Sequence, residues 1–309
     1  MDQTTTLNKK YTSSLSDKED SSNLLIQSRK LKDRLFKIAA MVFSFITIGM
    51  VFLIIGSLLA KGLRQINWAF FTQVAPDTFS AMMAKSSGQV IPGGIVNGIL
   101  GSIYLVALAS AMAVPFGILI GVYVYENSKK RYAAIIRDIA DILQGVPSIV
   151  IGIIAYIWIV VPLTKGYSVF AGSVALAIMM LPLIVRSTEE SLKMVPETLK
   201  EAAIALGAPY YKVILRVLIP SSFSGLMGGI LLAISRVLGE TAPLMLTTLG
   251  NPQVNWHIEK PISAVPLLIW QFYNDPNMVD LIWSSAVFLM GFVLILNLTS
   301  RWICARKKI

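Results

Sequence analysis

The chain has 309 residues and carries 27 Lys and Arg against 17 Asp and Glu, which gives a formal charge of +10. Hydrophobic residues make up 55% of the sequence and charged residues only 14%, whereas about 25% of the residues in a soluble domain are charged. This composition excludes a disordered chain, a collagen-like chain and an ordinary soluble enzyme. It indicates a protein that crosses a membrane several times.

The rare residue types exclude several kinds of site. There is one cysteine, Cys304, and one histidine, His257, so an intramolecular disulfide or a Cys/His zinc site is excluded. The sequence also lacks a G-x-x-x-x-G-K-[ST] loop, so we expect the chain itself to bind no ATP. We expect no catalytic residues, no bound metal or cofactor and no nucleic-acid partner. The excess positive charge should instead sort to one side of the bilayer.

The N-terminus differs in composition from the rest of the chain. Residues 1–28 are rich in Ser, Thr, Asn, Lys and Asp and lack the apolar core of a signal peptide. This composition predicts a disordered cytoplasmic tail ahead of a transmembrane domain at residues 29–309. The first predicted span, residues 38–60, is long enough to cross about 30 Å of hydrocarbon at about 1.5 Å per residue.

Five further apolar stretches predict spans, at residues 94–125, 139–161, 169–185, 221–249 and 281–303. Proline is tolerated inside a span because neighbouring helices can bind the freed backbone groups. Pro147 lies near the start of the third span, and Pro182 is expected to end the fourth. The sequence therefore predicts an all-α membrane protein with six transmembrane helices.

An even number of spans places both termini on one side of the membrane. Lys and Arg cluster near the N-terminus, in the connections 126–137 and 186–220, and at the C-terminus. The opposite side has far fewer, namely Lys61, Arg64, Lys85, Lys165 and Lys260. By the positive-inside rule, we expect both termini to be cytoplasmic.

The cytoplasmic connection at residues 187–220 predicts two short helices. Pro196 suits the first turn of a helix, Gly207 suits the left-handed residue after its end, and Pro209 can start a second helix. Four apolar residues follow the spacing of one helix face, namely Leu199, Ala202, Ala203 and Leu206. This stripe packs either against the spans of the same chain or against a soluble partner.

The same connection carries a sequence pattern. Its Glu-Ala-Ala string, a following glycine and a closing apolar-x-apolar-Pro resemble the EAA loop of ABC-importer permeases, although Val and Ile replace the usual Ile and Leu. The motif residues are Glu201, Ala202, Ala203, Gly207 and Pro220. The resemblance implies a coupling helix that docks on a cytoplasmic ATPase and transmits its closure to the membrane helices.

Two further sequence segments indicate which group of these permeases the chain resembles. Gly145-Val-Pro-Ser148 and Gly239-Glu-Thr-Ala-Pro243 are similar to segments of phosphate-import permeases of the A type, and the likeness extends over residues 35–305. It implies a MetI-like permease fold in the bacterial plasma (inner) membrane and inorganic phosphate as the cargo. The implied partners are membrane lipid, a homologous C-type permease, two cytoplasmic ATPase subunits that bind ATP and Mg²⁺, and an extracytoplasmic phosphate-binding protein.

Two charges lie inside the predicted fifth span. Arg236 and Glu240 are one helical turn apart and can pair. An ionised side chain at the bilayer centre costs from about 2.5 to more than 10 kcal/mol, so both should face the bundle interior or a wet cavity. They form either a structural ion pair or an anion pathway. In the pathway, Arg236 offers bidentate hydrogen bonds to an oxyanion, and Glu240 holds the guanidinium in place.

A third charge closes the predicted fourth span. Arg186 is either a positive-inside anchor or a second pathway cation, with Glu189 or Glu190 as its counter-ion. Asp138 and Asp141 are expected to lie at the membrane interface or to pair with Arg137.

Three other functions are alternatives to an ABC permease for phosphate. An arginine in a pathway serves any oxyanion, so a permease for sulfate, molybdate or a phosphonate fits the same residues. A secondary transporter working alone would need no coupling loop and no ATP. A membrane-embedded enzyme is disfavoured because the sequence lacks a metal-ligand cluster and an acid–base constellation.

Overall fold

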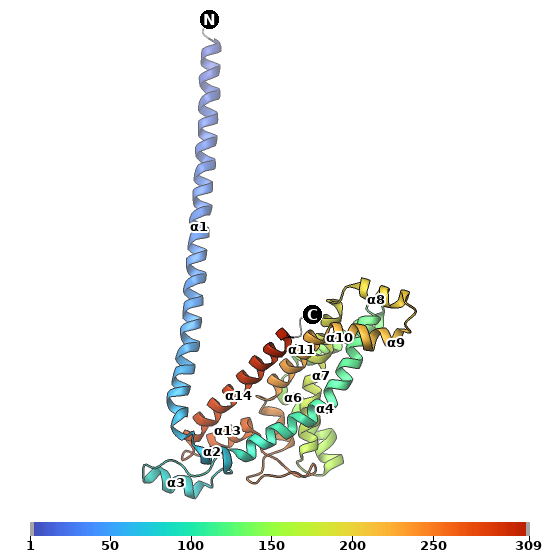
Figure 1. Cartoon of the computed structure of the whole chain (residues 1–309). Helices are drawn as coiled ribbons and strands as arrows, with labels where there is room; N and C mark the ends of the chain where they lie inside the picture. The colour runs from blue at the N-terminus through green and yellow to red at the C-terminus, as the bar shows by residue number, and fades with distance from the viewer. Residues whose placement is uncertain (1–2, 307–309) are drawn as a thin grey trace. The chain divides into compact units, whose positions relative to one another are not determined.

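The computed structural model describes residues 3–306, with side chains for residues 32–299, 301 and 302. Every regular element in the described residues is a helix, so the predicted fold class is confirmed (Figure 1). By length and composition, four of these helices could cross a membrane, and the number rises to six if each of two bent helix pairs counts as one span. The chain divides into two compact units, residues 1–57 and 58–309.

Helix α1 (Gln3–Gly62) contains the first predicted span at residues 38–60. It also continues through residues 3–28, where the composition predicted a disordered tail. No glycine or proline precedes Gly49, so nothing in the sequence interrupts a helix on the N-terminal side of the span. The domain boundary at residue 28 stays a prediction.

Three short helices connect α1 to the second span, namely η1 (Leu63–Gln65), α2 (Trp68–Thr72) and α3 (Thr78–Ser86). Side chains cap two of them. Asn67 accepts a hydrogen bond from the backbone N–H of Phe70 at 2.8 Å, and Asp77 accepts one from Ser80 at 3.3 Å. The Ser80 hydroxyl also donates to Asp77, and these bonds lower the pKa of that carboxyl below its usual value. Asp77 is therefore held in its ionised, capping form.

The second span, α4 (Val96–Glu126), passes through Pro115 without a break. The third span differs from the single helix predicted at residues 139–161. It is a bent pair in which α5 (Arg131–Gly145) meets the following helix at 102°. Pro147 causes the bend, because the residue before a proline avoids the helical region, and Val146 is extended with ψ 131°.

After that bend, α6 (Ser148–Ala155) runs directly into the π-helical segment η2 (Tyr156–Thr164). The fourth span is α7 (Val169–Lys193), whose first turn is capped by Ser168. The prediction that Pro182 ends this span is wrong, since the helix continues to Lys193. Pro182 is buried in the bundle, where neighbouring helices stabilise a proline inside a helix.

The loop predicted at residues 187–220 is mostly helical, and its first residues complete α7. Helix α8 (Glu197–Ala205) ends before Gly207, which has the expected left-handed conformation with φ +77°. Pro209 then caps a second helix, as predicted. This helix consists of three consecutive segments, α9 (Tyr210–Val213), η3 (Ile214–Leu218) and α10 (Ile219–Ser221).

The fifth predicted span, residues 221–249, is not one helix, and the apolar candidate span here is the bent pair of residues 210–221 and 223–237. Helix α11 (Phe223–Val237) bends by 71° from the preceding helix and stops before Gly239, and α12 (Ala242–Thr247) starts separately with Pro243 in its first turn. Glycine and proline explain the break, since both disfavour a helix interior. Two helices follow, α13 (Val265–Tyr273) and α14 (Val279–Arg306), and the second contains the sixth predicted span.

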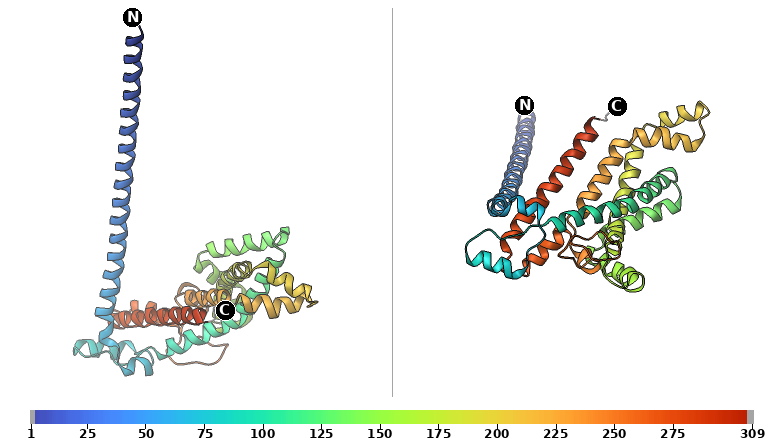
Figure 2. Two further views of the ribbon diagram at one scale, coloured as in Figure 1. Left: turned by 45° about the horizontal axis from the view of Figure 1, so that its top comes forward. Right: turned by 60° about the horizontal axis from the view of Figure 1, so that its bottom comes forward.

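The core of the second unit lies where α4, α7 and α11 pack together (Figures 1 and 2). Its largest fully buried side chains include Leu105, Leu176, Met180, Ile184, Leu244 and Leu267. Helices α7 and α11 approach so closely that a Cβ atom built on Gly229 would overlap the side chain of Ser187. Small residues at such crossings let helix backbones approach each other in a membrane.

This crossing gives a stability test at two adjacent glycines. We expect Gly229→Ala to destabilise the protein by about 1–3 kcal/mol, because the methyl group overfills the contact with Ser187. A methyl group on Gly228 meets no atom within 4 Å, so Gly228→Ala should be neutral or stabilising by up to about 1 kcal/mol. Thermal unfolding of the two purified variants in detergent measures both effects. Equal unfolding midpoints for the two variants would contradict the close contact between α7 and α11.

Candidate functional site

Arg236 and Glu240 form the ion pair that their spacing predicted. Arg236 lies in the last turn of α11, and Glu240 lies in the break before α12. The Arg236 Nε and Glu240 Oε1 atoms are 3.9 Å apart, which is an ionic contact but too long for a hydrogen bond. The side chain of Arg236 is 41% exposed and that of Glu240 is 19% exposed. The guanidinium is therefore held loosely, and its donors remain accessible to another acceptor.

The main partner of the Arg186 guanidinium is not one of the two carboxylates that were predicted as its counter-ions. Its Nε donates to Asp141 Oδ1 at 2.9 Å, and its Nη2 contacts Asp141 Oδ2, so the guanidinium binds this carboxylate through both arms of its fork. Glu189, one of the two predicted counter-ions, lies further away, with 3.7 Å between its Oε2 and Arg186 Nη1. The expected pairing of Asp141 with Arg137 is wrong, because Asp141 on α5 binds Arg186 on α7, and its place at the membrane interface stays a prediction.

Glu189 is the centre of this charge cluster, a role that the sequence analysis missed. Its side chain is fully buried, and its Oε1 accepts a hydrogen bond from Arg137 Nε at 2.7 Å and contacts Lys193 Nζ. Its Oε2 has no hydrogen-bond partner within the described residues. The sequence did contain one signal, since a Glu followed four residues later by Lys is a favourable helical pair.

A cavity of about 320 Å³ opens beside Arg186, between α5, α7 and α11. Polar and charged side chains supply most of its lining, which consists of Asp141, Gln144, Leu183, Arg186, Ser187, Glu190, Gly229 and Leu232. On α11, Gly229, Leu232 and Arg236 are spaced i, i+3 and i+7, so they share one helix face. The same face of α11 therefore carries one wall of this cavity and the half-exposed Arg236.

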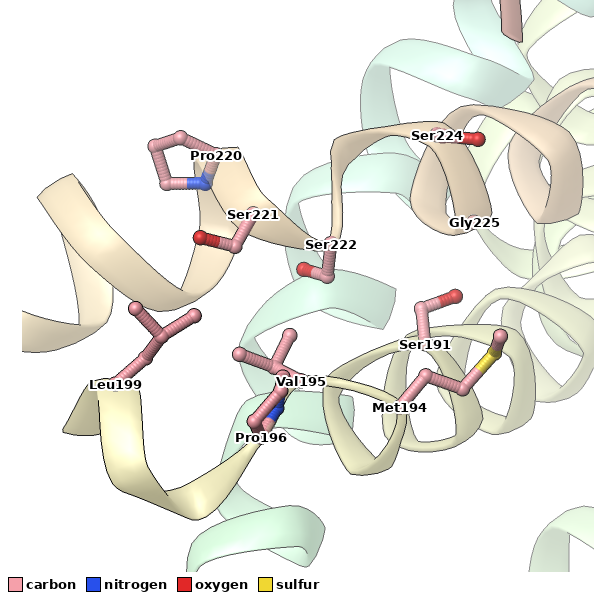
Figure 3. A pocket seen from close by; sticks show the side chains of 10 residues that line it. All are labelled: Ser191, Met194, Val195, Pro196, Leu199, Pro220, Ser221, Ser222, Ser224 and Gly225. Atoms are coloured by element: carbon pink, nitrogen blue, oxygen red, sulfur yellow. The ribbon is translucent and has the colours of Figure 1, made fainter. Parts of the chain in front are cut away.

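A larger cavity of about 630 Å³ separates α8 from α10 and the start of α11 (Figure 3). Apolar side chains such as Leu199 and Val195 lie on the α7–α8 side, and Pro220 and Ser221 lie opposite. The complete lining is Ser191, Met194, Val195, Pro196, Leu199, Pro220, Ser221, Ser222, Ser224 and Gly225. Pro220, the last residue of the predicted coupling motif, thus borders a cavity behind α8.

Helix α8 itself presents its apolar stripe outward. None of its residues is buried, Leu199 is exposed, and Leu206, directly after the helix, is 89% exposed. Glu201 and Ala202 are also exposed, whereas Ala203 packs partly against a small core that includes Val213 and Leu218. The spans of this chain therefore leave most of the stripe uncovered.

Among the residues whose side chains are described, no group of three or more His, Cys, Asp or Glu could hold a metal ion. The backbone N–H of His257 donates to Asn255 Oδ1 at 3.0 Å in the loop between α12 and α13, remote in sequence from the charged cluster on α5 and α7.

Comparisons with known proteins agree with this architecture. Residues 113–306 match the family described as "Binding-protein-dependent transport system inner membrane component". A phosphate transport system permease protein PstA from Yersinia pestis is 36% identical over 91% of this chain and 92% of its own length. Its counterpart from Xylella fastidiosa is 38% identical over 82% and 85%, and that from Haemophilus influenzae is 34% identical over 93% and 98%.

Solved structures of ABC transporters share the fold. A chain of an inward-facing MetNI methionine ABC transporter aligns with a TM-score of 0.59 and 19% identity, over 69% of this chain and 96% of that one. A chain of a bacterial alginate ABC transporter, in complex with its alginate-bound periplasmic protein, aligns with a TM-score of 0.59 and 14% identity, over 89% and 96%. The chain is therefore a multi-pass membrane protein that belongs to the family of binding-protein-dependent transport system inner membrane components, the permease subunits of ABC transporters.

Proposed function

We propose that this chain is the A-type permease subunit of an ATP-driven importer that moves inorganic phosphate into the bacterial cell. One observation carries the proposal: the relatives from three bacteria named above are phosphate transport permeases, and each aligns over more than four-fifths of this chain. The chain supplies the membrane pathway, and ATP is hydrolysed by partner subunits.

The geometry of Arg236 supports an anion pathway. A half-exposed guanidinium can donate two parallel hydrogen bonds to a phosphate. Glu240 lies near enough to weaken the attraction for an anion, but it does not occupy the guanidinium donors. A transport site needs this balance, because an ion that binds too tightly cannot leave.

Arg186 has a secondary place in the proposed pathway. Asp141 already occupies both arms of its guanidinium, so an anion in the neighbouring cavity would compete with a carboxylate for the same donors. Arg186 therefore contributes positive potential near the inner end of the pathway, whereas Arg236 contributes direct hydrogen bonds.

The uncovered stripe of α8 is the proposed docking surface for the ATPase. Glu201, Ala202, Ala203, Gly207 and Pro220 belong to this coupling unit. We infer that both termini are cytoplasmic, that a homologous C-type permease completes the pathway, and that two ATPase subunits and an extracytoplasmic phosphate-binding protein complete the importer. The excess of Lys and Arg in the connections on the α8 side supports this orientation.

Uptake of labelled phosphate tests the proposal. Proteoliposomes would contain this chain, the C-type permease and the ATPase, with the binding protein outside and ATP inside. We expect ATP-dependent uptake that phosphate analogues compete with and that sulfate, molybdate and phosphonate do not. Uptake of another oxyanion would keep the class and change the cargo. Uptake by this chain alone without ATP would contradict the whole proposal.

Arg236→Ala should abolish uptake while the complex still assembles, because the cation is lost from the pathway. Arg236→Lys should retain part of the uptake, since an ammonium keeps the charge but loses the bidentate fork. Arg131→Ala is the control, because this arginine is exposed at the start of α5. Uptake kinetics in proteoliposomes measure all three, and unchanged kinetics for Arg236→Ala would refute its role.

Substitutions in the coupling unit should separate ATP hydrolysis from transport. Glu201→Lys reverses the charge of an exposed residue, and Gly207→Pro is incompatible with a φ of +77°. Both variants should insert normally and lose uptake driven by ATP. Gly207→Ala should have a milder effect, since a left-handed alanine costs only about 1–2 kcal/mol. Normal uptake in the first two variants would argue that another surface docks the ATPase.

A further inference from the structure

Lys200 joins the coupling helix to the end of a membrane span. Its Nζ lies 2.8 Å from Glu126 Oε2 and 3.1 Å from Glu126 Oε1. Lys200 lies on α8, and Glu126 is the last residue of α4. The two side chains are 24% and 13% exposed, so this pair is better protected from water than a typical surface ion pair.

Two tyrosines complete the surroundings of this ammonium group. Its Nζ lies 5.5 Å from the ring centroid of Tyr125 on α4 and 5.2 Å from that of Tyr210 at the start of α9. Both distances are within the range of a cation–π interaction. The end of α4, the middle of α8 and the start of α9 therefore meet at one positive charge, with a carboxylate and two aromatic rings around it.

The other contacts of α8 are apolar, and Ala203 packs against Val213 on α9 and Leu218 on η3. The helix has no buried residue, and Lys200–Glu126 is its only ion pair among residues 32–299. On the side of Leu199, the cavity of about 630 Å³ separates α8 from Ser221 on α10 (Figure 3). Helix α8 is thus bonded directly to α4, whereas open space lies between it and the start of α11.

Helix α4 is in turn fixed to α7. A Cβ atom on Gly121 would lie 2.5 Å from the Cβ of Thr188, which shows how closely the two helices pack near their cytoplasmic ends. Helix α7 carries Arg186 and the buried Glu189. A displacement of Glu126 must therefore move α4 and α7 together, and Arg186 moves with them.

We propose that Lys200 is a positioning residue that transmits the movement of α8 through Glu126 to the α4–α7 pair. The proposal rests on the proposed function, because it assumes that an ATPase moves α8. The contact needs a cation, since neither the carboxylate nor the aromatic rings would hold a neutral side chain in the same way. Arginine could satisfy both kinds of partner, and methionine could satisfy neither.

The test measures phosphate uptake and ATP hydrolysis together in proteoliposomes that hold the complete importer. We expect Lys200→Met to lower the phosphate taken up per ATP hydrolysed by about tenfold, within the usual range of coupling between sites. Assembly and hydrolysis should persist, and Lys200→Arg should restore the ratio. Lys212→Met is the matched control, because it removes the same charge from an exposed position on α9.

A charge exchange keeps the test informative if Lys200→Met fails to assemble. Glu126→Lys alone should uncouple the importer, and the double variant Lys200→Glu with Glu126→Lys should recover most of the ratio. An uptake ratio in Lys200→Met equal to that of the parent would overturn the proposal. Failure of the double variant to improve on both single variants would also overturn it.

Glu201→Lys separates this proposal from the one on which it rests. If Glu201→Lys uncouples the importer and Lys200→Met does not, α8 docks the ATPase and the contact with α4 is not the route. If both variants transport normally, the docking role of α8 itself is wrong. If the parent complex takes up an anion other than phosphate, the same ratio is measured with that anion, and the role of Lys200 is judged independently of the cargo.

Discussion

The buried carboxylate of Glu189 is the constraint on which the packing of α5 against α7 depends. A charge without solvent must find opposite charges, and Glu189 draws Arg137 from α5 and Lys193 from its own helix. Removing one partner from a buried pair typically costs about 3–5 kcal/mol. This requirement holds α5 against α7 although α5 turns away from α6 by 102°. It also brings Asp141 beside Arg186. The ion pair that holds this arginine of the proposed pathway therefore depends on the buried charge of Glu189.

Three prolines show how much of the fold can be predicted from the sequence. Pro115 and Pro182 lie inside continuous helices, whereas Pro147 ends one. Pro182 is buried in a packed helix, whereas Pro115 and Pro147 are both exposed, so burial accounts for the continuous helix at Pro182 alone. Pro147 differs from Pro115 in having a glycine two residues before it, and glycine also disfavours a helix. The existence of the spans was therefore predictable from composition, whereas the effect of each proline on the helix was not.

The candidate site was predictable to a similar degree. A separation of four residues was sufficient to predict the Arg236–Glu240 pair, although Glu240 lies beyond the end of α11, and the turn at Gly207 followed from its residue type. Ion pairs between two helices could not be predicted in this way, because they depend on the rotation of each helix about its own axis. Asp141 was thus assigned to the wrong arginine, and the contact between Lys200 and Glu126 had no signal in the sequence.

The cross-helix ion pairs also impose an order on biosynthesis. Arg137 precedes its partner Glu189 by 52 residues, and Asp141 precedes Arg186 by 45. At about 5–20 residues per second, a ribosome needs about 3–10 s to make the first of these intervals. During that time α5 carries charges that have no counter-ions from α7. The two cross-helix ion pairs can therefore form only after the fourth span has been translated.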